Sequence, residues 1–184
     1  MYLRPDAFTA EQKARNFAYY EPLTVRDSSL SACTQAVIAA EVGQLDLAHD
    51  YLAEAALMDL RDVEHNTSDG VHMASLAGGW MALVAGFGGM RAGSGPLAFS
   101  PRLPDGITGL TFRMRYRGRK LRVTIGVDHV KYELMEGASM PVTHHGEEFQ
   151  LGKRSVERKV PPIKAGPRPE QPPGRPPYNR ASMS

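Results

Sequence analysis

The sequence is short of cysteine. Cys33 is the only one among 184 residues, so no disulfide can form within the chain, which suits a reducing compartment. A signal peptide is also missing, because the opening residues MYLRPDAF have neither a basic segment nor an apolar run. We therefore expect a cytoplasmic protein that is not held together by disulfides.

Long hydrophobic runs are absent as well. The most apolar window, residues 71–87, is interrupted by Gly, His and Ser and is short for a bilayer span. A buried helix is the better interpretation, so we expect no membrane contact and interpret Trp80 as a core residue rather than a sugar platform.

Acidic and apolar residues become rare toward the end of the chain. From Gly152 to Ser184, eight Lys and Arg face two Glu, which gives +6 and leaves −4 for residues 1–151. Eight Pro fall within residues 161–177. Such a segment buries too little surface to offset its ordering entropy, so we predict disorder. Tyr178 is its only aromatic residue, which favours a solvated extension over a nucleic-acid site.

The first half of the chain reads as helices. Thr9 and Gln12 form a capping-box pattern at the start of a helix over 9–20. SLSACTQAVIAAEV is apolar on nearly all sides and ends at Gly43, whereas LDLAHDYLAEAALMDL carries acids opposite an apolar stripe. VHMASLAGGWMALVAGF is again apolar all round. Inner helices that alternate with outer ones predict a concentric helix array.

The second half changes period. GFGGMRAGSG marks a boundary, and apolar residues then alternate with polar ones over 110–134, which predicts a three-stranded antiparallel meander. Three arginines occupy its exposed face: Arg113, Arg115 and Arg117. The fold class is therefore α+β, with 1–91 helical, 92–140 a β domain, and 141–184 a polar loop and disordered tail. HHGEE (His144–Glu148) lacks helical ligand spacing, so we expect a solvated loop and no metal site.

Two loops place small polar residues directly before apolar helices. TVRDSSLSA offers Asp27, Ser28 and Ser29, and SDGVHMASLAGGW offers Asp69 as a cap with His72 in the first turn. The first turn of a helix presents unpaired N–H groups and a positive dipole end, so it attracts anions. The same residues serve equally well as ordinary helix caps. The residues alone leave both interpretations open.

Four stretches carry a resemblance to glycoside hydrolase family 65: YYEPLTVRDSSLSA, AAEVGQLDLAHDYLAEAALMDLRD, TSDGVHMASLAGGWMALVAGFGGMR and LPDGITGLTFRMRYRGRKLRVTI. The resemblance covers about residues 1–137. It implies the last helices of an (α/α)6 barrel, followed by a β-sandwich-like domain. It further implies inverting hydrolysis or phosphorolysis of an α-glucosidic disaccharide of the trehalose, maltose or kojibiose type, in which an acid protonates the glycosidic oxygen while water or phosphate attacks.

The resemblance also implies roles for residues in both loops. Ser28, Ser29 and His72 would position phosphate or water, and Arg26, where phosphorylases of the family usually carry His, either strengthens anion binding or marks a hydrolase branch. The general acid of the family lies upstream and is not in this chain. No cofactor beyond phosphate is implied, and the expected partners are the disaccharide and the missing N-terminal part of the enzyme, with a homodimer left open. The alternatives are a non-catalytic carbohydrate-binding or structural module and an inactive truncated product.

Overall fold

The structure is a computed structural model that describes residues 7–25, 28–62, 65 and 67–171. These residues form four α-helices and seven β-strands, so the α+β class predicted from the sequence is confirmed. The described residues divide into a helical unit, which comprises those up to residue 86 together with 164–171, and a β unit, residues 87–163. None of the helices within the described ranges is long and apolar enough to cross a membrane.

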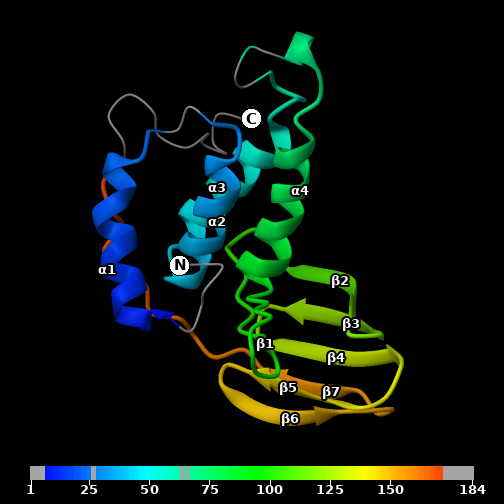
Figure 1. Cartoon of the computed structure of the whole chain (residues 1–184). Coiled ribbons are helices and arrows are strands. Elements are labelled where there is room, and N and C mark those ends of the chain that lie inside the picture. Colours follow the sequence, from blue (N-terminus) through cyan, green and yellow to red (C-terminus); the bar gives the residue numbers. More distant parts are fainter. Residues whose placement is uncertain (1–6, 26–27, 63–64, 66, 172–184) are drawn as a thin grey trace. The chain divides into compact units, whose positions relative to one another are not determined.

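The helical unit begins with α1 (Ala10–Tyr20), which starts as predicted (Figure 1). The Thr9 hydroxyl accepts the backbone N–H of Gln12, and the Gln12 side chain accepts the backbone N–H of Thr9. This capping box satisfies two donors that the helix itself leaves unpaired. A short 3-10 turn, η2 (Glu21–Leu23), follows at Pro22.

Helix α2 (Ser31–Glu41) is buried along most of its length, as its apolar sequence predicts. It ends in a Schellman motif: Gly43 donates to the carbonyl of Ala40, and Gln44 donates to that of Ala39. Gly43 has φ of 87°, a conformation that glycine adopts without steric cost. The chain therefore reverses directly into the next helix.

Helix α3 (Leu45–Leu57) departs from its predicted amphipathic pattern. Asp50 and Glu54 are only 6% and 5% exposed, so the acidic face is not a solvated one. Arg168 from the C-terminal segment lies 3.6 Å from the Asp50 carboxylate, and the Gln44 amide donates to the carbonyls of Gly166 and Pro167.

These contacts correct part of the predicted tail. Residues 164–171 run along α3 because their carbonyls and Arg168 find partners there. This segment has few apolar residues to bury, and hydrogen bonds to its backbone carbonyls together with one ion pair attach it instead. The rest of the predicted disordered segment, residues 172–184, lies outside the described residues.

The last helical elements are η3 (Thr67–Asp69), α4 (Met73–Met81) and the π-helical η4 (Ala82–Phe87). Helix α4 buries its small residues and exposes its large ones. Ser75, Gly78 and Gly79 are buried, whereas Met73 and Trp80 are 71% and 50% exposed. The expectation that this helix is buried on all sides, with Trp80 in the core, is therefore wrong.

Small residues face inward because α4 and α2 approach closely. A Cβ added at Gly78 would lie 2.5 Å from the Cβ of Cys33, a distance that real Cβ atoms do not show. Only glycine permits this approach, so the large side chains of α4 are left on the opposite face.

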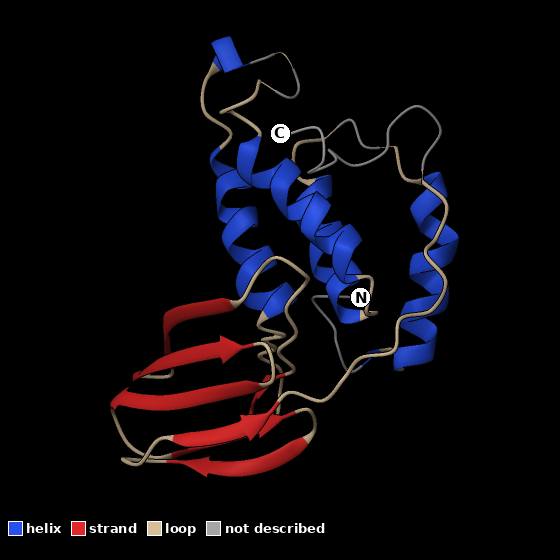
Figure 2. Ribbon diagram, turned by 180° about the vertical axis from the view of Figure 1, so that it is seen from behind, coloured by secondary structure: helices blue, strands red, loops and turns tan. Residues whose placement is uncertain are grey.

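The β unit contains two sheets (Figure 2). Strands β2, β3 and β4 form the predicted antiparallel meander, and β7 pairs with β4. A second sheet has the order β1-β5-β6, in which β1 pairs parallel with β5. The strand bounds are β1 Leu97–Phe99, β2 Gly109–Tyr116, β3 Arg119–Gly126, β4 His129–Glu136, β5 Met140–His144, β6 Glu147–Leu151 and β7 Val156–Lys159.

Tyr132 connects the two sheets at the centre of this unit. Its fully buried ring lies 5.4 Å from Phe99 of β1 and 5.3 Å from Phe149 of β6, measured between centroids. Its hydroxyl lies 2.8 Å from Nδ1 of His144 on β5. Since β4 carries Tyr132, one side chain joins a meander strand to all three strands of the other sheet.

The prediction of a polar loop and tail over 141–184 is wrong for residues 141–159. These residues form β6, β7 and all but the first residue of β5. HHGEE is likewise not a solvated loop. His144 is 4% exposed, and Glu147 begins β6. Pairing with β1 and β4, far away in sequence, gives these polar segments their order, and their local composition does not reveal it.

We expect the β unit to lose stability as the pH falls from about 6.5 toward 5. Burial holds the pKa of His144 below its usual value and lowers that of His145 to about 4. The unfolded chain then binds protons that the folded chain does not, so acidification favours unfolding. The melting temperature of His145→Gln should depend less on pH between 7.5 and 5. The control His65→Gln, at a side chain 90% exposed, should behave like the parent chain; equal pH profiles for all three proteins would contradict the prediction.

Candidate functional site

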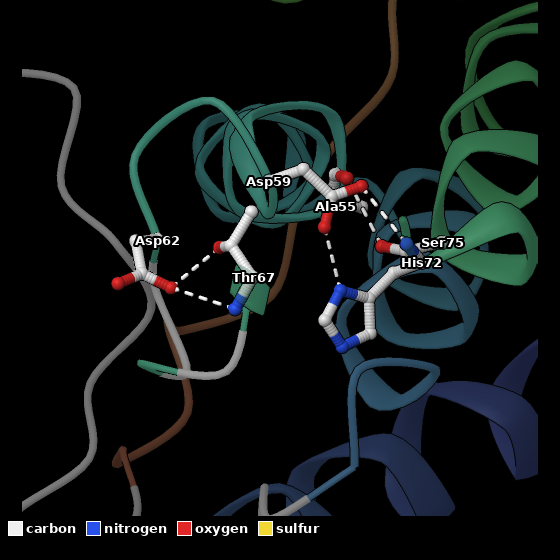
Figure 3. Close-up of polar contacts among 6 residues, drawn as sticks. All are labelled: Ala55, Asp59, Asp62, Thr67, His72 and Ser75. Atoms are coloured by element: carbon white, nitrogen blue, oxygen red, sulfur yellow. Dashed lines mark hydrogen bonds and ion pairs between the residues drawn. The ribbon is translucent and has the colours of Figure 1, made fainter. Parts of the chain in front are cut away.

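A carboxylate and an imidazole form the centre of the candidate site. Asp59 lies in the turn that follows α3, and His72 is the N-cap residue of α4. Oδ1 of Asp59 lies 2.6 Å from Nδ1 of His72, and Oδ2 accepts the backbone N–H of His72 at 3.0 Å (Figure 3). Both side chains are mostly buried, at 14% and 20% exposure.

This arrangement differs from the predicted one in two respects. His72 lies at the N-cap rather than in the first turn of the helix, and Asp69 belongs to η3 rather than capping α4. The carboxylate that meets His72 is Asp59, because α3 and α4 lie side by side and bring the two ends of their loop together.

Two further contacts fix the geometry of the pair. The Ser75 hydroxyl, which is fully buried, donates to the carbonyl of Ala55 at 3.0 Å and so joins α4 to α3 (Figure 3). Within the connecting loop, Asp62 accepts the backbone N–H and the hydroxyl of Thr67. These contacts fix the α3–α4 loop and the packing of α4 on α3, and thereby the position of His72.

The other predicted site residues lie on the loop before α2. Ser28 is exposed, and its Oγ accepts the N–H of Leu30 at 3.3 Å. Ser29 is half-buried. Arg26, together with Asp27, lies outside the described residues. Neither serine forms a hydrogen bond to His72 among the contacts of the described chain.

The starts of α2 and α4 nevertheless lie at the same end of the helical unit (Figure 1). Gly78 meets Cys33, and each helix begins only a few residues before this contact. Because α3 runs antiparallel between them along the chain, α2 and α4 point the same way. Within the described residues, the side chains of the N-cap residues, Leu30 and His72, accept no backbone N–H from the first turns of their helices. Two positive helix ends and one imidazole therefore share this rim.

This rim has the chemistry of an anion site or of a positioned water. If Nδ1 donates its proton to Asp59, the Nε2 atom of His72 is left for a ligand. Helix N-termini favour negative charge at the same place. No group of three or more His, Cys, Asp or Glu that could hold a metal occurs among the described residues.

Sequence reasoning missed Asp59. It stands thirteen residues before His72, in a loop whose path the sequence does not show. One signal was present: an acid directly after the end of a helix faces the negative end of the helix dipole, which is unfavourable unless a partner compensates it. His72 is that partner.

Two family models match the chain. The glycosyl hydrolase family 65 central catalytic domain matches residues 1–81, and the glycosyl hydrolase family 65 C-terminal domain matches residues 90–151. Together they account for more than three quarters of the chain.

Curated relatives agree with the family models. An uncharacterized glycosyl hydrolase of Mycobacterium leprae is 54% identical over 97% of the chain and 23% of its own length. The α,α-trehalose phosphorylase of Thermoanaerobacter brockii is 40% identical over 85% of the chain and 20% of its own length. The chain thus spans about a quarter of the length of the curated relatives it matches.

A solved structure is similar as well. It is described as a candidate kojibiose phosphorylase from the human microbiome, and it superimposes with a TM-score of 0.80 at 30% identity. The match covers 86% of this chain and 22% of the other.

Proposed function

Since the chain belongs to glycoside hydrolase family 65, we propose that it supplies the phosphate-binding wall of an enzyme that cleaves α-glucosidic disaccharides by inverting phosphorolysis. The observation that carries the proposal is the Asp59–His72 pair at the N-terminus of α4, beside the start of α2. The trehalose, maltose and kojibiose phosphorylases among its relatives support the substrate class.

The proposed reaction divides its work between this chain and residues outside it. A carboxylic acid protonates the glycosidic oxygen, and that carbon–oxygen bond breaks as a phosphate oxygen attacks the anomeric carbon from the opposite face. The products are a glucosyl phosphate of inverted configuration and the released sugar. His72, Ser28 and Ser29 would hold the phosphate, and Arg26 would add positive charge. The general acid would come from the preceding part of the catalytic domain, so the chain alone is expected to be inactive.

Other parts of the proposal follow from the same reaction. Acid–base chemistry on a glycoside needs neither a metal nor an organic cofactor, and phosphate is the co-substrate. The preceding helices of an (α/α)6 barrel would be the partner of the helical unit. A single buried Cys33 fits the proposed cytoplasmic location.

A chimera tests the reaction class. The matching part of the Thermoanaerobacter brockii trehalose phosphorylase is replaced by this chain, and activity is assayed on trehalose, maltose and kojibiose with and without inorganic phosphate. We expect activity that requires phosphate and yields glucosyl phosphate. Release of two free sugars regardless of phosphate would favour hydrolysis. A folded chimera that is silent on all three sugars would favour the non-catalytic module.

A further inference from the structure

A second candidate site lies in the β unit, on residues that the proposed phosphorolysis does not use. A cavity of about 310 Å³ is formed by residues 94–97 before and in β1, the β2–β3 turn, and Met140–Pro141 at the start of β5. This volume falls at the lower end of the range for small-molecule pockets, roughly 300–1,000 Å³. The cavity is therefore large enough for a sugar-sized ligand.

The lining combines an apolar floor with two guanidinium groups. The accessible part of the apolar floor comes from Pro96, Tyr116 and Pro141, whereas the other two apolar lining residues, Leu97 and Met140, are buried. Arg117 and Arg119 line it from the β2–β3 turn, and no lining residue is acidic. The nearby acid Glu136 is engaged by Arg115 and Lys120. The electrostatic field at the cavity therefore favours an anion.

Arg119 is held in place by the backbone. Its Nε donates to the carbonyl of Ala138 at 2.9 Å, and its Nη1 donates to the carbonyl of Arg117 at 3.0 Å. A guanidinium group has five N–H donors, and Nη2 makes no hydrogen bond to the described residues. An arginine fixed in this way loses little rotamer entropy when it binds an oxyanion.

Arg117 is oriented by a different contact. Its guanidinium carbon lies 5.1 Å from the centroid of the Tyr116 ring, at the wall of the same cavity. Its backbone φ of 46° places it in the left-handed region, at the corner of the turn. The tight turn therefore brings two guanidinium groups, only two positions apart in sequence, to one cavity.

We propose that this cavity binds a small phosphate monoester, with the phosphate on Arg117 and Arg119 and the carbon body against Pro96 and Pro141. Paired guanidinium donors match the geometry of phosphate oxygens. The apolar floor has no use in binding a free inorganic ion, so an ester is preferred over phosphate itself. The proposal does not depend on the proposed reaction, because the cavity lies wholly within the β unit.

The test is a titration of the whole chain with glucose 6-phosphate, inorganic phosphate, gluconate and glucose at constant ionic strength, followed by amide NMR. Gly95 lies in the cavity wall and Gly118 in the turn, so their amide signals report on this site, whereas that of Gly70 reports on the loop before α4. We expect glucose 6-phosphate to shift the first two signals, with weaker effects of inorganic phosphate and gluconate and none of glucose.

Two variants and one matched control identify the arginines. Arg117→Asn removes the charge but tolerates positive φ, and Arg119→Gln keeps an amide donor for the backbone carbonyls. Each should weaken binding about tenfold, the loss expected for one charge-assisted hydrogen bond. Arg113→Ala removes an exposed arginine from the adjoining strand β2, and Arg113 does not line the cavity, so this variant should leave affinity unchanged.

The opposite results would overturn the proposal. These are no shift at Gly95 and Gly118, equal weakening by the control, or gluconate binding more tightly than the phosphate ester. Shifts confined to Gly70 would support phosphate at the helical unit and still overturn this site. If one arginine variant loses the amide signals of the folded β unit, it has unfolded, and the affinity of the other variant then tests the site.

Discussion

Replacing Asp59 with alanine is expected to lower the turnover of the trehalose phosphorylase chimera about 100- to 1,000-fold, within the range that general acid–base groups contribute. His72 would lose both bonds that fix it, one to its ring and one to its backbone N–H. The imidazole could then rotate or change tautomer, so its Nε2 atom would no longer be held toward the ligand. Initial-rate measurements across phosphate concentrations test this expectation.

Asp59→Asn separates the two roles open to His72. Asparagine can still accept the backbone N–H, but its amide donates to Nδ1, which moves the ring proton of a neutral imidazole to Nε2. If His72 donates to a phosphate oxygen, this variant should retain more activity than Asp59→Ala. If Nε2 must accept a proton from water, both variants should be equally poor.

The control for both variants is Asp46→Ala, which removes an exposed carboxylate from the first turn of α3. Its turnover should stay within about twofold of the parent, because Asp46 lies at the opposite end of α3 from Asp59 and surface substitutions usually change stability little. A normal rate for a folded Asp59→Ala chimera would refute the positioning role. In that case the pair would serve only to hold the α3–α4 loop.

Gly89→Ala is expected to destabilise the β unit by about 3 kcal/mol or more. An added Cβ would lie 2.2 Å from the carbonyl oxygen of Ser100, and φ at Gly89 is +60°. The Gly89 carbonyl accepts the N–H of Ser100, so the two backbones cannot separate without losing this bond. Overpacking against rigid backbone and left-handed strain both oppose the substitution.

Urea unfolding of the β unit measures this effect. The matched control is Gly146→Ala in the β5–β6 turn, where φ is +89° but no atom lies within 4 Å of the added Cβ. This control carries the conformational strain without the collision, about 1–2 kcal/mol. Equal losses for the two variants would show that the close approach at Ser100 contributes nothing.

The parts of the fold that the sequence predicts correctly are those encoded by neighbouring residues. The Thr9–Gln12 capping box, the helix end at Gly43 and the β2–β3–β4 meander each depend on spacings of a few residues or on short turns. Local hydrogen bonds and alternating burial carry this information in the sequence itself.

The parts that escape prediction depend on partners far away in the chain. Strand β7 looks like a charged tail until it pairs with β4, and His144 looks solvated until Tyr132 and the Lys159 carbonyl meet its two ring nitrogens. Helix α4 is apolar all round, yet the close approach at Gly78 decides which face is covered.

The candidate site shows the same division. Both loops before α2 and α4 stand out by composition, and His72 can be named from the sequence. Its bond to Asp59 cannot, because the ends of α3 and α4 meet only after the two helices pack. Sequence therefore suggests the histidine, whereas tertiary structure supplies its partner.

The parallel pairing of β1 with β5 has a consequence for the order of assembly. Leu97 is paired with Val142, whereas each meander strand pairs with the next one along the chain. Closing a long loop costs entropy before any contact repays it, so local hairpins form early and distant pairs late. During synthesis on the ribosome, β1 emerges first of the seven strands, and until β5 has followed its only local backbone partner among the described residues is Arg91, which bridges to Ala98. The first strand of the β unit to be synthesised is thus among the last to join its sheet.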